Sequence, residues 1–182
     1  RAPNIYLLHG SMTSHEMNSL YNHPKVKAML SFTKGEGFGR PLLEFGITGK
    51  PIIASGYSGQ LDFLKPEHCV LLPGQLTKVD RSAADQFILK DSKWFTVNYQ
   101  YASQVIKECE KNYKKYIVNS RKQPQYIKDN FTMEHMTTKF TEILDNYVKV
   151  PEAVALKLPK LQKVGGTPSG QIKLPKLKKV EA

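Results

Sequence analysis

Short apolar runs alternate with polar, helix-forming segments along the first part of the chain. The runs that are typical of buried strands occupy residues 4–8, 26–32, 51–55 and 68–73. Each is four to eight residues long, and each is followed by a glycine- or proline-bearing segment. This spacing of strands, with room for a helix between most of them, predicts a parallel sheet whose strands are joined by crossover helices.

The segments between the runs carry helix signals. Thr13 and Glu16 have the spacing of a capping box, which predicts a helix that Pro24 ends. Pro41 stands where the first turn of a helix tolerates proline, and Gly49 is placed to end that second helix. A further short helix is expected over 60–64. The chain therefore predicts an α/β, Rossmann-like fold with helices on both faces of the sheet, within a domain over residues 1–150.

The pattern changes to a purely helical one after Tyr101. Apolar residues three or four apart predict one long amphipathic helix over 101–117, a shorter helix around 124–128, and a last helix over 136–147. We interpret these apolar stripes as faces that pack against the core.

The last part of the chain, residues 151–182, breaks this pattern. LKLPKLQKV (156–164) recurs as IKLPKLKKV (172–180), and such lysine-rich, proline-broken segments cannot build a core. The segment holds seven lysines and two glutamates, so it carries +5 of the net charge of +11. We expect a tail with two copies of a short linear motif, either a solvated segment or one that binds an acidic partner.

Composition excludes several classes of protein. With 182 residues and 40% apolar content, the chain is long and apolar enough for a folded domain, and no run approaches the roughly 20 apolar residues that cross a bilayer. Cys69 and Cys109 sit in apolar patterns that predict buried thiols, so we expect a reducing, cytoplasmic setting. Because the chain begins at Arg1 and runs directly into an apolar segment, we expect it to be part of a longer protein.

The stretch GEGFGRPLLEFGITGKP, residues 35–51, carries the candidate chemistry. Its glycines lie between an expected strand and an expected helix start, an arrangement that favours anion binding by backbone N–H groups. Neither of two common phosphate-loop patterns, GxGxxG or GxxxxGK[ST], fits this stretch. Glu36 lies inside the turn and Glu44 in the following helix. Carboxylates repel phosphate but accept hydrogen bonds from vicinal hydroxyls, so the pair indicates a ligand with hydroxyl groups at both ends of a diphosphate.

With these residues, EGFGRPLLEFGITGKPIIAS resembles the donor-site signature of retaining GT-B glycosyltransferases of glycosyltransferase family 4. The spacing of Glu36 and Glu44 matches that pattern, and the looser likeness extends over about residues 4–148. The resemblance implies the C-terminal, nucleotide-sugar-binding half of such an enzyme. It implies transfer with retention and without metal or another cofactor.

The resemblance also implies roles for individual residues. Glu36, the residue we would name catalytic, would bond the donor-sugar hydroxyls together with Gly37, Phe38 and Gly39, the N–H groups of Phe38 and Gly39 assisting. The remaining expected contacts are with the nucleotide: Glu44 with the ribose, Arg40, Leu42 and Leu43 with the diphosphate, and His9 and Gly10 near the nucleobase.

The chain departs from the family pattern in ways that limit the expected activity. Phe45-Gly46 replaces the usual Ala-Met, and Asp62 stands where a glutamate is usual. The basic diphosphate clamp and the acceptor-binding N-terminal domain of the family do not fit into the residues before Glu36. We therefore expect a nucleotide sugar as ligand, a missing N-terminal partner domain, and no transfer by this chain alone. The alternative is a non-catalytic nucleotide- or sugar-binding module, or an interaction protein.

Overall fold

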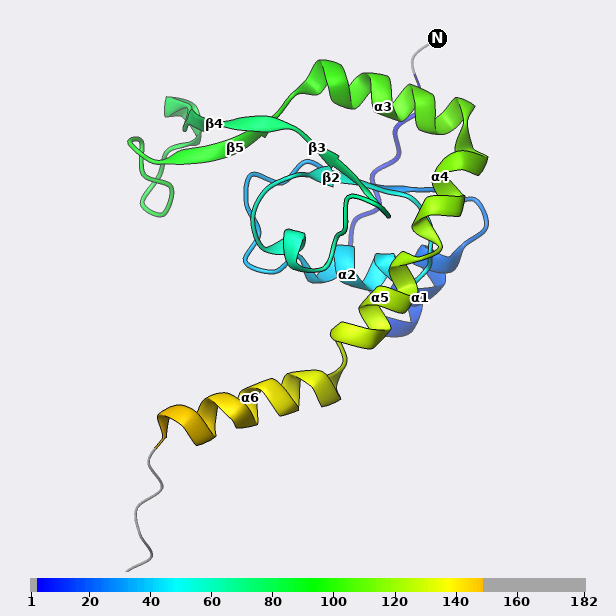
Figure 1. Cartoon of the computed structure of the whole chain (residues 1–182). Helices are drawn as coiled ribbons and strands as arrows, with labels where there is room; N and C mark the ends of the chain where they lie inside the picture. Colours follow the sequence, from blue (N-terminus) through cyan, green and yellow to red (C-terminus); the bar gives the residue numbers. More distant parts are fainter. Residues whose placement is uncertain (1–2, 149–182) are drawn as a thin grey trace, which may run out of the picture.

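A computed structural model describes residues 3–148 of the chain; the tail predicted at 151–182 lies outside the described residues. Its centre is a three-stranded parallel sheet of β1 (Met29–Ser31), β2 (Ile52–Ser55) and β3 (Val70–Leu72), in that spatial order. All four residues of β2 are buried, because the strand has a neighbour on each edge and side-chain packing on each face. The predicted α/β fold with a parallel sheet is confirmed (Figure 1).

Helix α1 (Ser14–Asn22) begins with the predicted capping box. The side chain of Thr13 accepts a hydrogen bond from the N–H of Glu16, whose carboxylate accepts one from the N–H of Thr13 at 2.8 Å. Helix α2 (Arg40–Gly46) starts with proline in its first turn, as predicted, and a short 3-10 helix, η1 (Gly59–Asp62), follows β2. The capping and proline signals were therefore sufficient to place the helices that flank the glycine turn.

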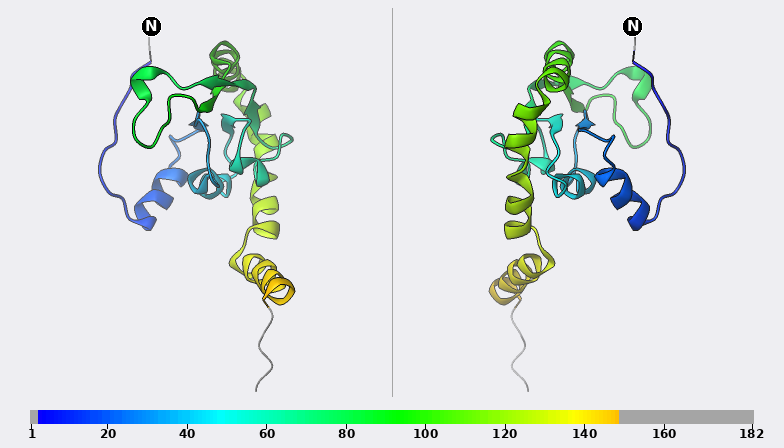
Figure 2. Two further views of the ribbon diagram at one scale, coloured as in Figure 1. Left: turned by 90° about the vertical axis from the view of Figure 1, so that its left-hand side faces the viewer. Right: turned by 90° about the vertical axis from the view of Figure 1, so that its right-hand side faces the viewer.

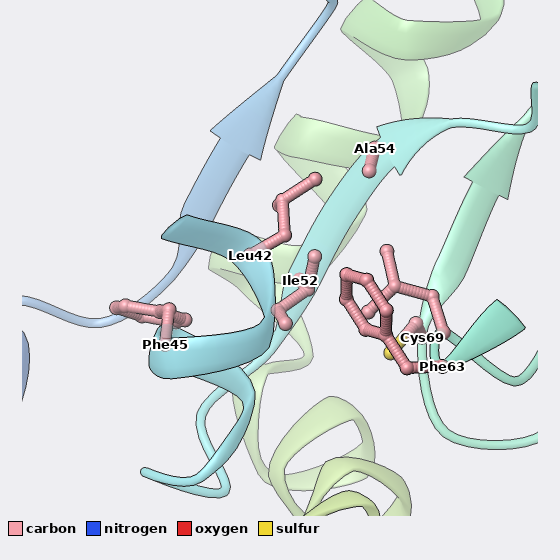
Figure 3. Packing of buried hydrophobic residues seen from close by; sticks show 7 residues of the cluster. Leu42, Phe45, Ile52, Ala54, Phe63 and Cys69 are labelled. Atoms are coloured by element: carbon pink, nitrogen blue, oxygen red, sulfur yellow. The ribbon is translucent and has the colours of Figure 1, made fainter. Parts of the chain in front are cut away.

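Alternate residues of β2 face two different apolar clusters. Ile52 and Ala54 join a cluster with Leu42 and Phe45 of α2. Figure 3 shows Leu42 and Ile52 between the helix and the strand, and Phe45 on the side of α2 that faces away from β2. Ile53 points into a second cluster, which α3 (Tyr99–Lys111) closes on the other side of the sheet. Figure 2 shows the sheet between α2 and α3. Period-two alternation in one buried strand thus builds two cores.

The strand predicted at residues 4–8 is wrong. The segment has no strand conformation, and its apolar side chains from Ile5 to Leu8 are 70–91% exposed. A strand needs a hydrogen-bonding neighbour, and β1, at the edge of the described sheet, pairs only with β2. The run therefore has the apolar residues that are typical of a strand, but the run alone does not determine whether a neighbouring strand pairs with it.

The single long helix predicted over 101–117 is also wrong. Asn112 leaves the helical conformation, with φ −115° and ψ 36°, and divides the segment into α3 and α4 (Tyr113–Ser120). Both thiols are buried as predicted, Cys109 on α3 and Cys69 just before β3, and burial raises the pKa of Cys69 to about 12. The spacing of apolar residues, three or four apart, continues from α3 into α4 because both helices face the same core.

Three further elements complete the described chain. A hairpin of β4 (Gly74–Lys78) and β5 (Lys93–Val97), which encloses the 3-10 turn η2 (Arg81–Ala83), was not predicted; Phe95 packs into the second cluster. Helix α5 (Gln123–Asn130) packs beneath α2, whereas α6 (Met133–Tyr147) projects away from the domain (Figure 1). The core packing expected for the last helix is wrong for the described residues, because every residue of α6 is exposed.

Candidate functional site

Two loops meet beyond the carboxyl ends of β1 and β2, where the candidate chemistry lies. The N–H of Glu36 donates to Ser58 Oγ at 3.0 Å, and the Ser58 hydroxyl donates back to the Glu36 carbonyl. The N–H of Gly59 donates to the same carbonyl at 3.0 Å. These three hydrogen bonds tie the glycine turn of β1 to the loop that follows β2, and so fix the backbone on both sides of Glu36.

Glycine is required at two positions of this junction. A Cβ on Gly59 would lie 2.1 Å from the Gly37 carbonyl oxygen, which no side chain tolerates. Gly39 has φ +87° and caps the start of α2 in the left-handed conformation that favours glycine. The glycines therefore serve the close approach of the two loops and the tight entry into α2.

The side chains on the glycine turn are open to a ligand. Glu36 is half-buried, and its carboxylate forms no hydrogen bond or ion pair with any residue in the described range. Gly37 and Phe38 are exposed, whereas Gly39 is buried; the N–H groups of Phe38 and Gly39 donate to no protein acceptor among residues 3–148. This turn therefore offers one unpaired carboxylate and, at the exposed Phe38, an unpaired N–H donor two residues further along the chain.

Arg40 directly follows Gly39 as the first residue of α2, and Glu44 lies one helical turn further along the helix. Arg40 Nε donates to Glu44 Oε1 at 2.6 Å, and the side chains are 80% and 39% exposed. Both residues line a groove of about 420 Å³ between α1 and α2, together with Met12 and Tyr21. Because the ion pair occupies Oε1 of Glu44, its second oxygen is left to accept hydrogen bonds from a ligand in the groove.

The other predicted contacts lie in different surroundings. Leu42 is a core residue, 2% exposed, and the N–H groups of Leu42 and Leu43 both donate to the Gly39 carbonyl, at 3.0 and 3.2 Å. His9 and Gly10 are exposed and do not line the groove. The structure thus pairs Arg40 with Glu44 in the groove, whereas neither Glu36–Gly39 nor His9 and Gly10 line it.

Two residues near the junction, Lys34 and Gln60, were missed by sequence reasoning, whereas Tyr57 had been considered either a sugar contact or a turn residue. Lys34 directly precedes the glycine turn; its Nζ lies 3.4 Å from Thr96 Oγ1 and 5.1 Å from the centre of the Trp94 ring. Tyr57 stacks on Phe95, with ring centres 4.9 Å apart. The hairpin β4–β5 therefore forms a wall beside the junction, and these contacts join residues so far apart in sequence that no local pattern reports them.

Gln60 is the second missed residue, and it is fully buried behind the junction. Its Nε2 donates to the carbonyl and the hydroxyl oxygen of Ser55, both at 3.0 Å, while its Oε1 has no partner among the described atoms. The Gln60 Cβ lies 3.4 Å from the position that a Cβ on Gly39 would take. Gln60 thus anchors η1 to the end of β2 beneath the start of α2.

Two further findings concern the described residues as a whole. No group of three His, Cys, Asp or Glu side chains within residues 3–148 is placed to hold a metal ion. No helix in the same range combines the length and apolarity that a membrane span needs.

Comparisons with protein families, with curated proteins and with solved structures find no match to this chain. The resemblance to retaining glycosyltransferases therefore stays a prediction, and a proposal about function rests on the geometry of the candidate site.

Proposed function

We propose that residues 35–48, together with Met12, form the donor half of a nucleotide-sugar site in a retaining glycosyltransferase of the GT-B, Rossmann-like type. The observation that carries the proposal is the groove between α1 and α2, in which the Arg40–Glu44 pair lies among both apolar and polar side chains. A groove of this kind suits a ligand with a flat base, a hydroxyl-bearing sugar and an anionic group.

The order of chemical groups along the chain supports this assignment. Glu44 offers a free carboxylate oxygen to a ribose diol, and Arg40 stands beside it as a cation for phosphate oxygens. Four residues before Arg40, in the glycine turn, the unpaired Glu36 carboxylate is available to the hydroxyls of a second sugar. Carboxylate, cation and carboxylate in this sequence match ribose, diphosphate and donor sugar.

The position of the site on the fold adds a second argument. The glycine turn follows the carboxyl end of β1, and the loop bonded to it follows the carboxyl end of β2. Ligands of parallel α/β sheets bind beyond the carboxyl ends of the strands. The wall formed by Tyr57 and Phe95 would shield the sugar side of such a ligand from water.

Isothermal titration calorimetry with UDP, GDP and ADP tests the proposal, because it measures binding and needs no transfer. We expect one of the three to bind, and Glu44→Gln to weaken it roughly 10- to 100-fold, which is the loss of about 1.5–3 kcal/mol expected for hydrogen bonds to a charged group. Glu134→Gln, an exposed glutamate on α6, is the matched control and should leave the affinity unchanged. An absence of binding at millimolar nucleotide, or equal affinity in the Glu44 and Glu134 variants, would refute the proposal.

A further inference from the structure

The groove between α1 and α2 has one wall that is weakly attached to the rest of the domain. Helix α2, on one side, buries Leu42, Phe45 and Gly46. Helix α1, on the other side, supplies half of the lining residues and yet has no buried residue. A helix of nine residues depends on packing for its stability and its place. The position of α1, and with it the width of the groove, therefore depends on a small number of contacts.

Lys50 provides two of these contacts from the turn between α2 and β2. Its Nζ donates a hydrogen bond to the carbonyl oxygen of Tyr21 at 2.6 Å and another to the carbonyl oxygen of His23 at 2.9 Å. Tyr21 lies in the last turn of α1, and His23 is the residue that caps its C-terminal end. One ammonium group thus holds the end of α1 from a different element.

A cation suits this end of α1. The last carbonyl groups of a helix have no partner within the helix and carry the negative end of its dipole, so they attract positive charge. Helix α1 has no basic residue in its own last turn. Lys50 supplies the missing cation, and its ammonium group forms no ion pair with a carboxylate within residues 3–148. Lys50 is also half-buried, and this burial, followed by the charge of Lys27, lowers the pKa of its ammonium group.

The turn from which the Lys50 side chain extends is fixed on the α2 side. Gly49 has φ +68°, and its carbonyl oxygen accepts a hydrogen bond from Ser120 Oγ of α4 at 2.8 Å. The N–H of Lys50 donates to Thr48 Oγ1 at 3.2 Å, and the Thr48 hydroxyl donates to the Phe45 carbonyl at 2.7 Å. Thr48 itself lines the groove just after α2. Lys50 is therefore joined to one groove wall through its backbone and to the other through its side chain.

We propose that Lys50 is a positioning residue for the candidate site, which sets the separation of the two groove walls by holding the end of α1 near the end of α2. The inference rests on the function proposed above. Lys50 does not line the groove, so it acts on a ligand through the residues of α1. The Tyr21 ring packs edge-on against Phe45, with ring centres 5.5 Å apart, and both Tyr21 and Glu44 line the groove. A shift of α1 therefore changes the space beside Glu44.

The nucleotide affinity of matched lysine variants of the full chain tests the inference. Lys50→Met keeps an unbranched side chain but removes the ammonium group, and it should weaken binding of the nucleotide that calorimetry selects roughly tenfold. The apparent dissociation constant rises because the fraction of molecules with α1 in place falls. Lys50→Arg keeps the charge and several N–H donors, and should restore most of the affinity.

Lys25→Met is the matched control for the loss of one positive charge. Lys25 is an exposed lysine near the same end of α1, and its backbone N–H, unlike its side chain, forms a hydrogen bond in the described range, to His23 Nδ1. This variant should bind nucleotide like the unaltered chain. Circular dichroism of all three variants shows whether each is folded at the temperature of the titration.

Hydrogen exchange of the nucleotide-free chain separates this inference from the proposed function. In Lys50→Met the amides of α1 should exchange at least about tenfold faster than in the unaltered chain, whereas those of β2 and α3 should keep their rates. Lys25→Met should change none of these rates. If the unaltered chain binds no nucleotide, the proposed function fails and the role of Lys50 in that site fails with it, while the exchange rates still report whether Lys50 holds α1.

Three further results would overturn the inference. Equal exchange of the α1 amides in Lys50→Met and Lys25→Met would mean that other contacts hold α1. Faster exchange of α1 with unchanged nucleotide affinity would mean that binding does not depend on the position of α1. An equal loss of affinity in both variants would assign the effect to net charge.

Discussion

Helices α2 and α6 have apolar faces that look alike in the sequence and differ in what covers them. The seven-residue α2 buries Leu42, Phe45 and Gly46 against the sheet. The fifteen-residue α6 buries none of its residues in the described chain. Periodicity in the sequence therefore predicts a helix and its apolar face. It does not predict the surface against which this face packs, because that surface depends on contacts between distant parts of the chain or between chains.

The largest effect that separates the two helices is expected from truncating one phenylalanine on each. Phe45 is 1% exposed and packs edge-on against Tyr21, so Phe45→Ala should lower the free energy of unfolding by about 3–5 kcal/mol at every protein concentration. Phe140→Ala should cost less than about 0.5 kcal/mol, because Phe140 on α6 is 59% exposed. Urea unfolding of the two variants and of the unaltered chain measures both losses. Equal losses in the two variants would contradict the difference between the helices.

A smaller effect should appear in the pH dependence of the α2 core. Burial raises the pKa of Cys69 to about 12, against about 9 for an exposed thiol, so the unfolded chain releases this proton first. The stabilisation is complete below pH 9 and declines as the pH rises toward 12, by up to about 1.4 kcal/mol per pH unit. Cys69→Ala should flatten this decline in urea unfolding between pH 8 and 11, and an unchanged slope would show that the thiol is not buried there.

The fold near the glycine turn was predictable because its signals are local. The capping box of Thr13 and Glu16 placed α1, Pro41 placed α2, and the short, mostly apolar run of β2 marked the central strand. The segment at 4–8 carries a similar apolar run, yet no strand within residues 3–148 pairs with it. Strand formation depends on a neighbour, and a neighbour is not encoded in the run itself.

The candidate site was predictable in part for the same reason. Glu36 and Glu44 were identified because their chemistry and spacing lie within nine consecutive residues. Three contacts at the site were not identified: the hydrogen bond from Glu36 to Ser58, the position of Met12 in the groove, and the stacking of Tyr57 on Phe95. Each contact joins segments that lie more than 20 residues apart in the sequence and that only the fold brings together.

We propose above all that the glycine turn and the α1–α2 groove bind a nucleoside diphosphate. The most direct test is the two-dimensional amide NMR spectrum of the full chain during titration with the nucleotide that calorimetry selects. If the nucleotide binds there, the amide signals of Met12, of Gly37–Arg40 and of Glu44 should shift together with one dissociation constant, while the amide signals of α6 should not shift. Shifts confined to other parts of the chain, or no shifts at saturating nucleotide, would contradict it.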